Sequence, residues 1–309
     1  MHGKIPKNVV LRCQENPLFS LQDVPFAASD VYNAGCTKMD GEYRLLVTVE
    51  HLEGDCGIYC ARSKDGRKFT MDDEPLLSSR DEDAHPVYES QGVRDARVTE
   101  IDGEYYICYL AQSPHGVRLA LARANGNGKP ERMGLVSQPD TKGGTLFPRK
   151  IKGKYARLER PREGGNIWIA YSDDLLNWGG WQAVMTPRHG YWDYHRIGTG
   201  APPIYTPEGW LVLYYGVRRK PTGDLFRLGA AFLDLDDPTR VLGRSNVPIL
   251  APSEPYERLG DVQNIVFTCG AVLNEEKNDL LEIYYGAADS CVCLGTVPLH
   301  VLNRVCFGS

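Results

Sequence analysis

The sequence lacks a long hydrophobic run, because no window approaches the roughly 18 consecutive apolar residues that span a bilayer. The stretch 1–17 lacks the apolar core that a signal peptide needs. No segment keeps a 3.6-residue apolar period over the length of a helix, which argues against the α/β classes. These absences predict a cytoplasmic protein with no membrane partner, built from strands.

Ligand spacing for a metal is also missing. The nine cysteines are an odd number scattered through apolar runs, and the seven histidines are dispersed. Zinc sites need closely paired ligands, so we predict no metal site and expect reduced cysteines in the core. The net charge of −5 is spread along the chain without a basic block, which argues against nucleic acid as the main partner and leaves a lone basic groove as the alternative.

What the chain does have is a repeated pair of strand signals, rich in glycine and tyrosine. The first strand of each pair starts at residue 41, 103, 153, 209 or 279. Five similar sheet units are typical of a propeller, which leaves only short sheet edges. We therefore predict an all-β fold with one five-bladed β-propeller over residues 1–309. The alternative, a pair of β-sandwiches, would not need five similar units.

One carboxylate stands out because of its position ahead of a strong strand signal. Asp95 lies between Arg94 and Arg97 in a predicted polar turn, and the aromatic strand 104–109 follows. A carboxylate held next to a rigid strand is well placed to donate a proton. On these residues alone, a solvated Asp paired with a neighbouring Arg remains the alternative.

In a propeller, the residues that flank the first strand of each pair converge on one pocket. Here these are polar side chains of several kinds: Asn33, Glu50, Asp95, Arg97, Lys142, Arg160, Arg196, Tyr215, Asn264 and Asp289. Such a ring suits a neutral polyhydroxylated ligand such as a sugar. Tyr191, Trp192 and Tyr194 could supply a stacking face or could pack in the core. His115 and His195 are further candidates for the pocket wall.

Six short stretches together resemble glycoside hydrolase family 130, which contains inverting β-mannoside phosphorylases and β-mannosidases. They are YNAG at 32–35, GVRDAR at 92–97, LFPRKI at 146–151, IGTGAPP at 197–203, GDVQNIVF at 260–267 and YYGAAD at 284–289. The resemblance runs from about residue 15 to residue 300. It implies a five-bladed propeller that acts on small β-manno-oligosaccharides without a cofactor. Members of the family often form oligomers, so the sequence leaves open whether this chain forms a homo-oligomer.

The resemblance also implies roles for particular residues. The family's general acid falls on Asp95, although Ala96 replaces the usual proline of the G-V-x-D-P-R signature. In the family this Asp is thought to protonate the glycosidic oxygen through a hydroxyl of the sugar, which is held by residues that fall on Asn33 and Asp289. The other predicted substrate-binding residues are Arg97, Tyr215, Trp192, Asp193 and His195.

The nucleophile decides between two reactions. Phosphate must be held by cations, whereas water needs a second carboxylate roughly 6.5–9.5 Å from the acid. Where family phosphorylases carry an Arg and a His, this chain has Thr48 and Tyr215, although the phosphate-site candidates Lys142, Arg160 and Arg196 keep their charge.

The two neutral replacements favour water, so the sequence predicts an inverting β-mannosidase. Its base would be Glu50, Asp193 or Glu257. The alternative is phosphorolysis to mannose 1-phosphate, with inorganic phosphate as co-substrate. A non-catalytic mannose-binding propeller is less favoured, because it would not need Asp95.

Overall fold

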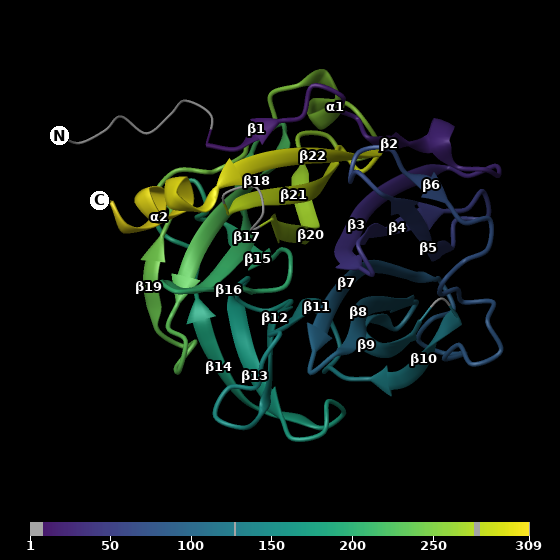
Figure 1. Ribbon diagram of the computed structural model, residues 1–309, viewed down its shortest axis with the longest axis horizontal. Coiled ribbons are helices and arrows are strands. Elements are labelled where there is room, and N and C mark those ends of the chain that lie inside the picture. Colours follow the sequence, from purple (N-terminus) through teal and green to yellow (C-terminus); the bar gives the residue numbers. More distant parts are fainter. Residues whose placement is uncertain (1–8, 127, 275–278, 309) are drawn as a thin grey trace.

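The computed structural model describes residues 9–126, 128–274 and 279–308. Its strands form five antiparallel sheets arranged around a central axis (Figure 1), which confirms the predicted five-bladed propeller. Buried apolar side chains fill the space between each sheet and the next, in five clusters. In the described part of the chain, no helix is long and apolar enough to cross a membrane.

The strands follow the sequence blade by blade. Blade 1 contains β3 (Asp30–Met39), β4 (Glu42–Glu50), β5 (Cys56–Ser63) and β6 (Thr70–Met71). Blade 2 contains β7 (Val93–Ile101), β8 (Glu104–Ser113), β9 (Gly116–Asn125) and β10 (Gly128–Leu135). Blade 3 contains β11 (Thr141–Leu146), β12 (Tyr155–Pro161), β13 (Ile167–Ser172) and β14 (Trp178–Met185).

The last two blades are less regular. Blade 4 contains β15 (Arg196–Thr199), β16 (Ile204–Thr206), β17 (Gly209–Lys220), β18 (Gly223–Leu233) and β19 (Val241–Arg244). Blade 5 contains β20 (Val266–Asn274), β21 (Leu280–Ala287), β22 (Cys291–Pro298), and the early strands β1 (Leu11–Arg12) and β2 (Phe19–Ser20). Among the described residues, three short helices complete the fold: η1 (Leu21–Asp23), α1 (Pro255–Arg258) and α2 (Leu299–Phe307).

The ring closes in blade 5, where strands from both ends of the chain share one sheet. Leu11 pairs with Thr296 and Phe19 pairs with Val292, so β1 and β2 both lie along β22. Next to this junction, the Arg12 guanidinium donates to both carboxylate oxygens of the fully buried Glu257, at 2.7 and 2.9 Å. Glu257 also accepts a hydrogen bond from Tyr285 in β21. A buried, charge-assisted contact therefore holds the junction.

Each blade begins one strand earlier than the sequence predicts. The strands predicted as the first of each pair are β4, β8, β12, β17 and β21, each of which is preceded by another strand nearer the axis (Figure 1). Asp95 lies within β7 and not in the polar turn that the sequence predicts. The signal was weak because these inner strands carry the polar residues that face the channel, so their alternation of apolar and polar residues is broken.

Four inner strands are also bulged. The pairing register shifts between Tyr32 and Gly35 in β3 and between Arg94 and Arg97 in β7, with similar shifts in β11 and β20. A bulge takes a residue out of the ladder and turns its side chain. Asn33 and Asp95 occupy these positions with positive φ angles of 46° and 57°, which Asn and Asp tolerate better than most residues. The bulges therefore turn these two side chains toward the channel.

Candidate active site

A cavity of about 860 Å³ lies where the inner strands converge, and every blade contributes to its wall. The polar and charged residues that line it are Tyr32, Asn33, Glu50, Arg94, Asp95, Asp140, Lys142, Arg160, Arg162, His195, Arg196, Tyr215, Asp261 and Asp289. Val262, Ile265, Phe267 and Phe226 provide an apolar part of the wall. A large concave site with convergent polar groups and an apolar face is typical of sugar binding.

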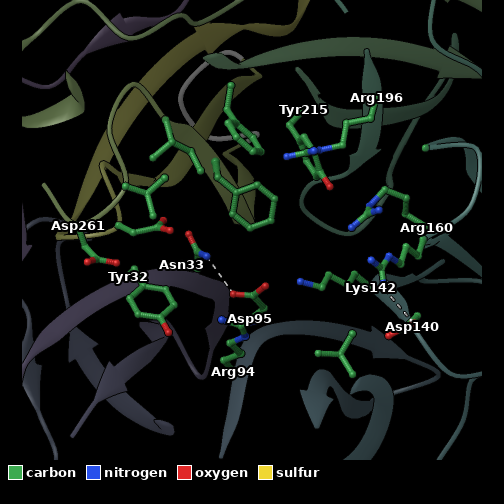
Figure 2. Close-up of a pocket in the computed structure, with 18 of the residues that line it drawn as sticks. Tyr32, Asn33, Arg94, Asp95, Asp140, Lys142, Arg160, Arg196, Tyr215 and Asp261 are labelled. Carbon is green, nitrogen blue, oxygen red and sulfur yellow. Dashed lines mark hydrogen bonds and ion pairs between the residues drawn. The ribbon is translucent and has the colours of Figure 1, made fainter. Parts of the chain in front are cut away.

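Asp95 is held from three directions. Its backbone N–H donates to Oγ1 of Thr48 at 3.0 Å, and its carbonyl accepts from Nη1 of Arg97 at 2.8 Å. Its carboxylate oxygen Oδ1 accepts a hydrogen bond from Nδ2 of Asn33 at 2.9 Å (Figure 2). Three groups thus fix both the backbone and the side chain, as expected of a group that must meet a substrate in one orientation.

Asp289 lies in the turn after β21 and lines the cavity beside these groups. Burial, and then the negative charge of Asp95, raises the pKa of Asp289 to about 7. Oδ1 of Asp289 and Oδ1 of Asn33 are both buried and find no hydrogen-bond partner among the described residues. Because buried polar atoms are normally paired, these two oxygens are available for the hydroxyl groups of a ligand.

Cationic side chains face Asp95 across the cavity. Figure 2 shows Lys142, Arg160 and Arg196, with the Tyr215 hydroxyl, pointing toward the space opposite Asp95 and Asn33. Burial, and then the charge of Arg94, lowers the pKa of Lys142. Arg196 is partly neutralised by Asp224, at 3.1 Å. Nε of Arg160 is buried without a hydrogen-bond partner in the part of the chain that the structure describes. This group of cations suits a small anion.

The cavity contains nine of the predicted residues: Asn33, Glu50, Asp95, Lys142, Arg160, His195, Arg196, Tyr215 and Asp289. Two others, Arg97 and Thr48, lie beneath it. Arg97 is fully buried, spans from Asp95 to the Gly200 carbonyl of blade 4, and stacks over Phe267. Thr48 is fully buried on β4 and uses its hydroxyl as the acceptor for Asp95. Neither residue is among those that line the cavity, so the predictions of Arg97 as a substrate ligand and Thr48 as a phosphate-site candidate gain no support.

Trp192 and Asp193 lie in the core between blades 3 and 4 and not in the cavity wall. Trp192 stacks on Tyr214, with ring centroids 5.7 Å apart. Asp193 is fully buried and accepts hydrogen bonds from Arg188, Arg244 and Tyr214. These saturated contacts fit a structural role, so the prediction of both as substrate-binding residues, and of Asp193 as a base, is corrected.

The remaining base candidate and the aromatic candidates also lie elsewhere. Glu257 is buried at the ring closure with Arg12 and Tyr285, away from the cavity. The Tyr191 ring lies under the Arg188 guanidinium, and the Tyr194 hydroxyl donates to the Arg219 carbonyl. The predicted pocket residues His115 and Asn264 also do not line the cavity. Glu50 is therefore the sole member of the predicted base set that lines it.

Sequence reasoning missed several residues of the wall. Arg94 lies next to the predicted acid in the same short motif, but the sequence alone favours no role for it beyond pairing with a neighbouring carboxylate. Asp261 and Phe267 lie in the stretch 260–267 that carried part of the family resemblance, so a signal was present there. Tyr32 likewise lies in the stretch 32–35 that carried part of the resemblance, whereas Phe226 and Asp140 gave no signal, because an aromatic residue or a turn Asp is common elsewhere in the chain.

Within the described ranges, no three side chains of His, Cys, Asp or Glu lie close enough together to bind a metal ion. All nine cysteines are free thiols, and eight of them are buried, as predicted for core residues.

The five-bladed fold, the carboxylate with its buried amide partner and the opposed cations together define a carbohydrate-active propeller.

Comparisons with known proteins agree. The chain belongs to glycoside hydrolase family 130: the family model, described as beta-1,4-mannooligosaccharide phosphorylase, matches residues 18–306. Beta-1,2-mannobiose phosphorylase of Listeria innocua is 42% identical over 91% of this chain and 82% of its own length. The 1,2-beta-oligomannan phosphorylase of a Thermoanaerobacter species is 35% identical over 85% of this chain and 88% of its own.

The fold likeness is equally broad. The structure of the Listeria innocua beta-1,2-mannobiose phosphorylase in complex with beta-1,2-mannobiose superimposes with a TM-score of 0.85, at 32% identity. The match covers 96% of this chain and 99% of that one. The resemblance to family 130 that the motifs indicated is therefore confirmed. The preference for water as the nucleophile gains no support, because the relatives named here are phosphorylases.

Proposed function

We propose that the protein is an inverting β-mannoside phosphorylase, which cleaves β-linked manno-oligosaccharides with inorganic phosphate to give mannose 1-phosphate. The observation that carries the proposal is the group of cations, Lys142, Arg160 and Arg196, that faces Asp95 across the cavity. An anionic nucleophile needs such a group, whereas water does not. Arg94 lines the same cavity beside Asp95, and its positive charge adds to the effect of burial in lowering the pKa of Lys142.

In this proposal Asp95 donates its proton toward the glycosidic oxygen while a phosphate oxygen attacks the anomeric carbon from the opposite face. The bond from that carbon to the glycosidic oxygen breaks, and the leaving sugar departs with a new hydroxyl group. Hydrogen phosphate brings both the nucleophile and the proton that restores Asp95, so the reaction needs no separate base. Attack from the opposite face inverts the anomeric centre and gives the α-phosphate.

The unpartnered oxygens of Asn33 and Asp289 support binding of the sugar whose bond is cleaved, since each can pair with a hydroxyl group. We assign the preferred linkage as β-1,2. The support is that the 42% and 35% identical relatives carry names with β-1,2 linkages. The β-1,4 linkage in the description of the family model is the alternative.

The test is an incubation with β-1,2-mannobiose or β-1,4-mannobiose, with and without millimolar phosphate, and chromatography of the products. We expect equal amounts of mannose and mannose 1-phosphate from the β-1,2 substrate, and only when phosphate is present. Two molecules of mannose at a phosphate-independent rate would overturn the proposal in favour of hydrolysis, with Glu50 as the first candidate base. Asp95→Asn is the control, because it should abolish either reaction.

A further inference from the structure

The bulge in β7 leaves the backbone of Asp95 outside the sheet. Pairing with β8 passes from Arg94 opposite Leu110 directly to Arg97 opposite Cys108, so Asp95 has no ladder partner there. Its N–H group is bound instead by the side chain of Thr48, which comes from the neighbouring blade. A buried N–H group without an acceptor is costly, so this hydroxyl replaces the missing ladder bond.

Thr48 is itself rigidly placed. It lies in the middle of β4, paired with Tyr32 on one side and Ile58 on the other, and its side chain is fully buried. A β-branched side chain on a central strand has few rotamers, so its hydroxyl oxygen is fixed relative to β7. The Thr48 hydroxyl oxygen, which accepts the hydrogen bond from Asp95 and holds it at a φ of 57°, is therefore preorganised.

We infer that Thr48 is a positioning residue for the proposed general acid, acting through the backbone N–H of Asp95. The inference rests on the proposed acid role of Asp95. Without the Thr48 hydroxyl, the bulge can rotate to find another acceptor and carry the carboxylate away from the glycosidic oxygen. Displacement of a catalytic group by about 1 Å can cost on the order of 100-fold in rate.

The test compares three variants on β-1,2-mannobiose with phosphate. Thr48→Val keeps the shape of the side chain and removes the hydroxyl, and we expect kcat to fall about 10- to 100-fold with KM nearly unchanged. Thr48→Ser restores the hydroxyl, and its kcat should return to within about threefold of the unaltered protein. Thr145→Val is the matched control, because Thr145 is buried on the inner strand β11 and its hydroxyl has no hydrogen-bond partner among the described residues.

A second substrate separates positioning from general damage. A 2,4-dinitrophenyl β-mannoside has a leaving group that needs no proton, so acid catalysis is unnecessary. We expect Thr48→Val to cleave it at the rate of the unaltered protein, as Asp95→Asn should. Equal losses on both substrates, or a kcat of Thr48→Val on mannobiose equal to that of Thr145→Val, would overturn the inference. If the unaltered protein leaves both mannobioses intact, the proposed function fails instead.

Discussion

Asn33 of blade 1 donates a hydrogen bond from Nδ2 to Oδ1 of Asp95 of blade 2, at 2.9 Å, and both residues stand at bulges in neighbouring inner strands. The two strands approach closely, because a Cβ at Gly35 would lie 2.4 Å from the Ala96 carbonyl oxygen. Only glycine fits that contact. The amide of Asn33 therefore couples the geometry of blade 1 to the carboxylate that we propose as the acid.

Replacing Asn33 with alanine removes a hydrogen bond to a carboxylate and an oxygen proposed to bind the sugar. Hydrogen bonds to charged groups contribute about 1.5–3 kcal/mol, so we expect kcat/KM for mannobiose to fall at least about 10-fold. Asn177→Ala is the control: Asn177 donates a similar bond to Asp174 in an exposed turn, at 2.8 Å. Equal activity in the two variants would contradict the assignment.

Removing a cation should weaken phosphate binding selectively. Lys142→Ala and Arg160→Ala each delete a donor to the proposed phosphate, so the KM for phosphate should rise by about 10- to 100-fold. Lys154→Ala is a matched control, because Lys154 is exposed and pairs with Asp173 at 2.8 Å. Initial rates over a range of phosphate concentrations measure the effect. Unchanged phosphate dependence in both cavity variants would argue against the assigned anion site.

Asp289 should make stability depend on pH. Its pKa is raised from 3.8 to about 7, so between these values the folded chain holds a proton that the unfolded chain has lost. This contribution to stability is full below about pH 4 and is lost as the pH rises to 7. Asp289→Asn cannot lose that proton, so its stability relative to the unaltered protein should increase between pH 5 and pH 8. Each pKa unit corresponds to about 1.4 kcal/mol, so the increase should reach a few kcal/mol.

Urea unfolding of the two proteins at pH 5 and pH 8 measures this difference. Titrating groups that do not interact with Asp289 affect both proteins alike and cancel in the comparison. A difference in unfolding free energy that stays constant with pH would show that Asp289 titrates normally in the folded state.

The ion pair at the ring closure should matter for stability and not for the reaction. Glu257→Gln leaves the Arg12 guanidinium without its charged partner, and breaking a buried pair typically costs about 3–5 kcal/mol. We therefore expect a lower melting temperature. At a temperature where the variant is fully folded, its kcat should match that of the unaltered protein. A kcat lower by orders of magnitude would return Glu257 to the list of candidate bases.

The fold was predictable because the middle strands of each blade are buried and rich in β-branched and aromatic residues. Strands β4, β8, β12, β17 and β21 therefore repeat a recognisable signal five times. The inner strands were not predictable in the same way, because a bulge and channel-facing polar residues hide the period-2 pattern around Asn33 and Asp95.

The site was predictable for residues that flank the predicted first strand of a blade, because such residues converge on the central pocket. Asn33, Asp95, Lys142 and Asp289 are examples. It was not predictable for charged residues that find partners in the core. Asp193 and Glu257 read as free carboxylates in the sequence, but Arg188 and Arg244 neutralise the first and Arg12 the second. Those partners lie far away in the sequence or across a turn, so only the folded chain brings them together.

The pairing of Leu11 with Thr296 also constrains how the protein can be made. During synthesis β1 leaves the ribosome long before its partner β22, because the strands of the other four blades lie between them in the sequence. Until then the growing sheet exposes unpaired strand edges, which are prone to associate with other chains. Asp289 lies just ahead of β22, so a chain released before this point lacks both its closing strand and one wall of the cavity. We therefore expect a chain that ends just ahead of Asp289 to keep an unpaired sheet edge and to aggregate.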